Sequence, residues 1–215
     1  RQAVTNIQQG LAMLGTERTA SIFLQHSLLS RLNQHYFPLQ QTFLAFSQFF
    51  VFLVEDIAVL TKSSSINMLK TTAYFLLSRL FTLPNLRAQL VWNTNPQCSF
   101  QVNSLITLSQ SVDLQQDAVL LAQAWQQSPA IIQLLQTYDQ HANISDTEDA
   151  DETNGYLLGL ALIMAKQSYF PQSNQCEATE KYLGIALETL NISEIQWADL
   201  HKKLMIKAQI SCQIF

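Results

Sequence analysis

The side chains that could do nucleophilic, acid–base or metal chemistry are few and lie far apart in this sequence. The histidines are His26, His35, His141 and His201, and the cysteines are Cys98, Cys176 and Cys212. No histidine has another histidine, a cysteine or a carboxylate three or four positions away, the spacing of a metal pair on a helix. The GxSxG, P-loop, GxGxxG and HExxH signatures are also missing. We interpret His26 as a surface residue and His141 as the first residue of a loop.

Carboxylates are concentrated in two places along the chain. The acidic segment 146–152 does not fit the calcium-loop pattern, which needs alternate oxygen ligands, Gly at the sixth position and Glu at the twelfth. We therefore expect a solvated loop there. Glu55 and Asp56 interrupt an apolar run and form the most suggestive acidic pair. A helix end that reaches solvent explains the same pattern.

The composition limits the class of protein. The chain has 215 residues, of which 48% are hydrophobic and 13% charged, so most of it can bury a core and is not disordered. The net charge of −4 argues against a nucleic acid as the main partner. The longest apolar run, residues 43–54, is shorter than the roughly 20 residues that span a membrane, so we expect a buried helix. Three scattered cysteines are typical of a reduced, cytoplasmic protein.

The elements that must position these residues are predicted to be helices. Only five glycines and five prolines interrupt apolar residues at helical spacing, which predicts an all-α fold of nine or ten helices in one domain, 1–215. Two helices are expected before residue 38, and later ones over 42–60, 66–81, 113–137, 156–169, 177–190 and 197–210. A polar stretch at about 142–153 is expected to be a surface loop. Because a helical pattern begins directly at Arg1, we expect a domain cut from a longer protein.

The segment 115–140, QQDAVLLAQAWQQSPAIIQLLQTYDQ, is predicted to be two helices joined at a hinge, Ser128-Pro129. Capping boxes are indicated at Asp113–Gln116 and Ser193–Gln196. In such a box the first side chain and the Gln three residues later satisfy each other's unpaired backbone amides. The first box therefore marks the start of the hinged pair, and the second marks the start of the last helix.

Two stretches of the chain resemble the HDOD domain. Near the N-terminus an Ala-Val pair is followed by a Leu-Gly; these residues are Ala3, Val4, Leu14 and Gly15. In the segment 115–140 the family's order of a small residue, Leu, Trp, Pro and an Ile pair is met by Ala118, Leu121, Trp125, Pro129, Ile131 and Ile132. Later residues that suit the family are Leu160-Ala161 and Leu183-Gly184-Ile185. The resemblance implies an HD-domain-like helical bundle, with the family's additional N-terminal helices missing or replaced.

HDOD domains are helical regulatory modules of bacterial signalling, related to HD-type phosphohydrolases in which His and His-Asp residues hold metal ions that activate water. The resemblance places Ser78 and Arg79 at the position of the His-Asp pair. It places Leu114 at an upstream His position. The paired His at the end of the segment falls at Tyr138 and Asp139.

A second register of the same resemblance sets residues 53–58 at the His-Asp position, with Glu55 in place of the His and Asp56 after it. Under both registers the full ligand set is gone. Arg79 would also place a fixed positive charge where a cation should bind. The resemblance therefore implies a domain with no catalytic residue, no bound metal and no cofactor.

Three functions remain open from the sequence. The first is a non-catalytic regulatory domain that acts through a protein or small-molecule partner, with Trp92, Tyr138 and the acidic loop as exposed contact candidates. The second is an HD-type metal-dependent phosphohydrolase with unusual ligands. Those ligands would be Glu55, Asp56, Asp139 and His141. The third is a structural helical module that mediates oligomerisation.

Overall fold

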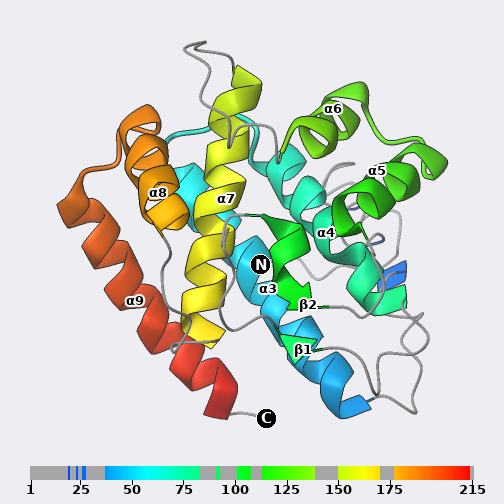
Figure 1. The fold of residues 1–215 in the computed structure, drawn as a ribbon, viewed down its shortest axis with the longest axis horizontal. Coiled ribbons are helices and arrows are strands. Elements are labelled where there is room, and N and C mark those ends of the chain that lie inside the picture. Colours follow the sequence, from blue (N-terminus) through cyan, green and yellow to red (C-terminus); the bar gives the residue numbers. More distant parts are fainter. Residues whose placement is uncertain are drawn as a thin grey trace, which may run out of the picture.

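A computed structural model describes most of the chain from residue 37 onward and a few residues before it (Figure 1). The described residues are 19, 23, 26–27, 37–82, 91–92, 101–107, 113–138, 150–169 and 177–213. The four described positions before residue 37 are helical, as expected for that region. The N-terminal stretch that resembles the HDOD domain lies outside the described residues.

Seven α-helices lie within the described residues, and the all-α fold is confirmed (Figure 1). They are α3 (Phe37–Leu60), α4 (Ile66–Thr82), α5 (Leu114–Ala124), α6 (Pro129–Thr137), α7 (Ala150–Tyr169), α8 (Glu177–Thr189) and α9 (Glu194–Gln213). Between α4 and α5, strand β1 (Val91–Trp92) pairs antiparallel with β2 (Ile106–Thr107), and the 3-10 helix η2 (Val102–Leu105) comes directly before β2.

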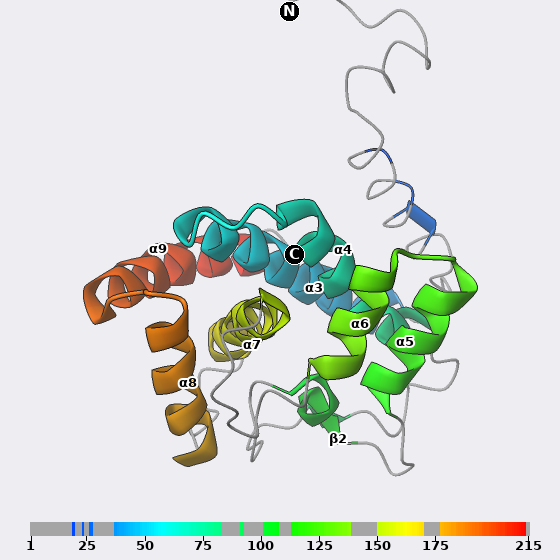
Figure 2. The same cartoon turned by 90° about the horizontal axis from the view of Figure 1, so that it is seen from above.

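Helix α7 forms the centre of the bundle. Every residue from 155 to 166 is buried, because this stretch is apolar around nearly its whole circumference and packs on all sides. It packs against α3, α8, α6 and α9. Figure 2 shows α7 nearly end-on, with α8 on one side of it and α6 on the other. Helix α7 therefore links α3 to the C-terminal helices α8 and α9, whereas α5 packs against α4 and α6.

The apolar run of α3 is a core helix, as predicted. Phe46, Phe50, Leu53 and Ile57 are fully buried and recur every three or four residues, so they form one face that packs on α4 and α7. Within the described residues, every helix is too short or too polar to cross a bilayer.

Three predicted helix starts are wrong, and one of them is that of α9, which begins at Glu194 and not at residue 197. Helix α3 begins at Phe37 and not at residue 42, because Pro38 falls in the first turn, where its missing N–H has no intrahelical partner to lose. Helix α7 begins at Ala150 and not at residue 156. The last part of the loop expected at about 142–153 is therefore helical. Asp151 and Glu152 belong to its first turn, where negative charge is favoured by the helix dipole.

Three helices end in the same way, with a non-glycine residue in the left-handed region. Lys62, Gln126 and Asn191 have φ of 56°, 52° and 53°. At each, the next residue donates its N–H back across the last turn: Ser63 to Ala58 O (2.8 Å), Gln127 to Ala122 O (3.0 Å) and Ile192 to Leu187 O (2.9 Å). These are Schellman motifs, which satisfy the last carbonyls of α3, α5 and α8.

The hinged pair of helices is confirmed as α5 and α6, with Pro129 at the first position of α6. Asp113 caps α5 by accepting the N–H of Gln116 at 2.9 Å. Trp125, at the end of α5, packs edge-on against Phe75 of α4 with ring centroids 6.0 Å apart. The hinge is thus fixed against α4.

The second predicted capping box is complete. Ser193 N donates to Gln196 Oε1 at 2.9 Å, and Gln196 N donates to Ser193 Oγ at 3.3 Å. Because both orphan amides are satisfied locally, α9 begins at Glu194 directly after the turn that ends α8.

Candidate functional site

Three of the positions that the first register assigns to metal ligands lie in the apolar core. Ser78 on α4 is 1% exposed, Leu114 at the start of α5 is 1% exposed, and Tyr138 after α6 is 3% exposed. The prediction that Tyr138 is an exposed contact residue is therefore wrong, because its ring belongs to the buried cluster. The backbone of Arg79 lies within α4, whereas its side chain, the side chain of Trp92 and all of Asp139 lie outside the described part of the structure.

One polar contact joins the two ends of the hinged pair. Gln115 Nε2 donates to the carbonyl oxygens of Leu135 at 2.8 Å and of Gln136 at 3.3 Å. The first turn of α5 consequently lies beside the last turn of α6, and we call this place the hairpin end (residues 113–117 and 134–138).

The hairpin end offers little chemistry. The N–H of Leu114 donates to Asn103 Oδ1 at 2.7 Å, and Asn103 Nδ2 donates to Asp113 Oδ1 at 3.0 Å. These bonds join η2 to the start of α5, so the polar groups there are used to hold helices. Leu114 supplies no ligand atom in its side chain, and the buried Tyr138 phenol is a poor metal ligand compared with an imidazole or a carboxylate.

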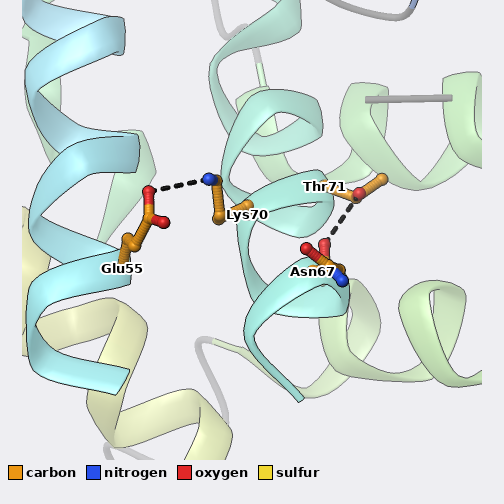
Figure 3. A network of polar contacts seen from close by, with 4 residues as sticks. All are labelled: Glu55, Asn67, Lys70 and Thr71. Carbon is orange, nitrogen blue, oxygen red and sulfur yellow. Dashed lines mark hydrogen bonds and ion pairs between the residues drawn. The ribbon is translucent and has the colours of Figure 1, made fainter. Parts of the chain in front are cut away.

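The second register places Glu55 and Asp56 in α3, five and four residues before its end at Leu60. Figure 3 shows the Glu55 carboxylate directed at Lys70 of α4, with Glu55 Oε2 2.7 Å from Lys70 Nζ. The two side chains are 45% and 24% exposed. This half-exposed ion pair joins α3 to α4. On α4 in the same view, Thr71 Oγ1 donates to the carbonyl oxygen of Asn67 at 2.9 Å.

The Glu55 charge also acts on Tyr74, which lies one turn after Lys70 on α4. Burial raises the pKa of the Tyr74 phenol above its ordinary value of 10.0, and the negative charge of Glu55 raises this pKa further. A phenol that stays protonated at neutral pH is a hydrogen-bonding group and not a base. The Glu55 carboxylate therefore makes an electrostatic contact between α3 and α4.

Metal-ligand geometry can be judged for part of the chain. Among the described residues, no three His, Cys, Asp or Glu side chains come close enough to hold one ion. His201 on α9 lies 3.2 Å from Gln167 Oε1 on α7, measured from Nε2, which is a contact between helices. His26 is exposed, as predicted. His141, a proposed unusual ligand, falls outside the described residues.

A pocket that the sequence did not predict lies where two helix connections meet the N-terminal part of α7. Its volume is about 370 Å³. We call it the corner pocket; its lining residues are Thr61, Lys62, Ser63, Ser64, Ser65, Thr153, Asn154, Leu157, Thr189, Leu190 and Asn191. They come from the α3–α4 connection, the N-terminal part of α7 and the α8–α9 turn. In the sequence each of these stretches looks like an ordinary turn or helix start, so only the fold brings them together.

The lining of the corner pocket is polar, and among its described residues only Lys62 carries a charge. Hydroxyl and carboxamide side chains dominate its lining, two leucines complete it, and Lys62 is the one ionised residue among those that line it. Such a surface can donate and accept several hydrogen bonds, yet it has no paired acid and base for catalysis. Comparisons with protein-family models, with curated proteins and with solved structures find no match.

Proposed function

We propose that this chain is a non-catalytic, cytoplasmic regulatory domain of the HDOD type, which acts by binding a small molecule or a protein partner. The observation that carries the proposal is the burial of Ser78, Leu114 and Tyr138, each at most 3% exposed, at the positions where related hydrolases hold metal. A water-activating centre needs several ligand atoms that converge on an accessible ion. Packed side chains at these positions serve the stability of the bundle instead.

The arrangement of the hairpin end supports the same function. Its polar side chains are engaged in contacts between helices, as in the bond from Gln115 to the Leu135 carbonyl. A regulatory domain needs a rigid scaffold that presents binding surfaces, and bonds of this type fix helices α5 and α6 relative to each other. The proposed domain thus keeps the helical frame of a hydrolase and uses other surfaces for recognition.

The test is a measurement of metal content together with hydrolysis of p-nitrophenyl phosphate in the presence of Mn²⁺, Fe²⁺ or Mg²⁺. We expect no turnover above that of a heat-denatured sample and no stoichiometric metal. Stoichiometric metal with turnover that is lost in Asp56→Asn or Asp139→Asn, but kept in the control Asp199→Asn on the exposed face of α9, would overturn the proposal. That result would favour the phosphohydrolase with unusual ligands.

A separate measurement distinguishes a regulatory domain from a purely structural one. Sedimentation velocity gives the oligomeric state, and thermal unfolding with candidate ligands gives the response to binding. A regulatory domain is expected to gain thermal stability with at least one ligand. A stable oligomer that responds to no small molecule and no protein partner would support the structural oligomerisation module.

A further inference from the structure

The corner pocket holds polar groups that the protein does not use for its own structure. Within the described residues, the side chains of Lys62, Ser64, Asn154 and Asn191 make no hydrogen bond or ion pair. By contrast, Thr61 Oγ1 donates to Ile57 O at 3.0 Å, and the Ser63 hydroxyl oxygen accepts the N–H of Ser65 at 3.2 Å. The first group of side chains is therefore available to a molecule that enters the pocket.

The charge and shape of the pocket restrict that molecule. Lys62 is the only ionised residue in the described lining. Its ammonium can pair with one anionic group of a ligand, whereas a polyphosphate would need further positive charges. No aromatic ring is among these lining residues, so a nucleobase finds no stacking surface. A volume of about 370 Å³ lies at the small end of the range for ligand pockets.

We propose that the corner pocket binds a small polyhydroxylated molecule with a single phosphate group, such as a sugar phosphate. The Lys62 ammonium contacts the phosphate, and the hydroxyl and carboxamide groups of Ser64, Asn154 and Asn191 bond the ligand's hydroxyls. The inference rests on the proposed function, because it gives the regulatory domain the class of small molecule to which it responds.

The position of the pocket explains how binding could be transmitted. The main packing partner of both α8 and α9 is α7, and the α8–α9 turn meets the α3–α4 connection across the pocket. In the upper part of Figure 1, the α3–α4 connection passes beside the N-terminal part of α7. A ligand that bonds both Lys62 and Asn191 links the α3–α4 connection to the α8–α9 turn. This link adds to the packing of α8 and α9 on α7. Occupancy therefore stabilises one placement of the C-terminal helix pair.

The test uses isothermal titration calorimetry of the full chain with glucose 6-phosphate, ribose 5-phosphate and glycerol 3-phosphate, and with glucose and inorganic phosphate as partial ligands. We expect at least one sugar phosphate to bind tenfold or more tightly than either partial ligand. Lys62→Gly should weaken that binding at least tenfold, because it removes the ammonium and leaves a backbone that glycine adopts easily.

The matched control is Gln126→Gly. It makes the same backbone change at φ 52° in the Schellman motif of α5, and Gln126 is not among the residues that line the pocket. Binding should be unchanged in this variant, and Lys62→Arg should retain most of it. Asn191→Gly, also at a left-handed position, should weaken binding without loss of folding.

Three results would overturn the inference. They are an absence of binding by the whole panel at millimolar concentration, equal affinity for inorganic phosphate and the sugar phosphates, or wild-type binding by Lys62→Gly. The same samples are assayed for released phosphate. Hydrolysis would count against the non-catalytic function, whereas a failure to bind would count against the pocket and leave a protein partner as the regulatory contact.

Discussion

The hairpin end and the corner pocket differ in how they use their polar groups. At the hairpin end, Asn103, Asp113 and Gln115 all bond other parts of the chain, and Leu114 and Tyr138 fill the core beside them. In the corner pocket, the side chains of Lys62 and Asn191 make no such bonds within the described chain. The difference teaches that polar side chains at one end of the bundle hold helices together, whereas those in the corner pocket remain available for hydrogen bonds to a bound molecule.

Replacement of Leu114 by Ala is the strongest test of this contrast. Because Leu114 is 1% exposed, we expect Leu114→Ala to lower the free energy of unfolding by about 2–5 kcal/mol. Ser64→Ala in the corner pocket should change it by less than about 0.5 kcal/mol, because Ser64 is exposed and bonds no other part of the described chain. Urea unfolding of both variants measures the difference. Similar losses in the two would remove the distinction between the regions.

A smaller effect is expected where α7 and α8 approach each other. A Cβ added at Gly159 would collide with the ring and hydroxyl of Tyr182, which is buried and also packs on Tyr156 with centroids 5.4 Å apart. Gly159→Ala should therefore cost about 1–3 kcal/mol and should also weaken sugar phosphate binding, since α8 supplies one wall of the pocket.

The control for that substitution is Gly184→Ala on the exposed side of α8. A Cβ there meets nothing within 4 Å, so alanine should stabilise the helix by about 0.5–1 kcal/mol. Thermal and urea unfolding compare the two. If both glycines tolerate alanine equally, α8 does not depend on close contact with α7 and the wall of the pocket is set by other residues.

The left-handed residues give a third, smaller comparison. Lys62→Gly and Gln126→Gly should each raise the free energy of unfolding by about 0.5 kcal/mol, since relief of the left-handed backbone slightly outweighs the greater freedom of glycine in the unfolded chain. Chemical denaturation measures this directly. A gain at Gln126 combined with a loss at Lys62 would mean that the Lys62 side chain supports the fold, which would contradict its availability to a ligand.

The smallest effect concerns the ionisation of Tyr74. Its folded pKa is raised above 10.0, so the unfolded chain loses this proton first as the pH rises. The contribution of Tyr74 to the free energy of unfolding is therefore fully present below pH 10. It decreases as the pH rises above 10. Glu55→Gln should lower the Tyr74 pKa toward 10.0. The pKa should stay above 10.0, because burial of the phenol still raises it. An ultraviolet titration measures the shift, with Tyr74→Phe to identify the signal; an unchanged pKa in Glu55→Gln would contradict the role of Glu55.

Much of the helical frame could be predicted from the sequence, because its causes are local. Apolar spacing located α3 and α4, and the Ser193–Gln196 spacing gave a capping box that forms both of its bonds. The late start assigned to α7 came from counting polar residues as loop. Its signal was present in Asp151 and Glu152, whose charges suit the first turn of a helix.

The candidate sites were harder to predict, because their causes lie between distant residues. Tyr138 was expected at the surface, but the direction of a side chain at the end of α6 depends on how that helix packs on its neighbours. The corner pocket joins Lys62, Asn154 and Asn191, and no periodicity or motif relates them. The HDOD character remains a prediction from hydrophobic motifs, since an all-α bundle is compatible with many families.

The central position of α7 has a consequence for synthesis of the chain. A ribosome makes α3, α4, α5 and α6 before α7, yet α3 buries much of its apolar face against α7. Roughly 30 further residues must be synthesised after α6 before α7 is complete and can cover α3. At a synthesis rate of about 5–20 residues per second this takes a few seconds. The nascent chain exposes phenylalanine-rich surface during this interval, and chains released before residue 169 are expected to bind chaperones or aggregate.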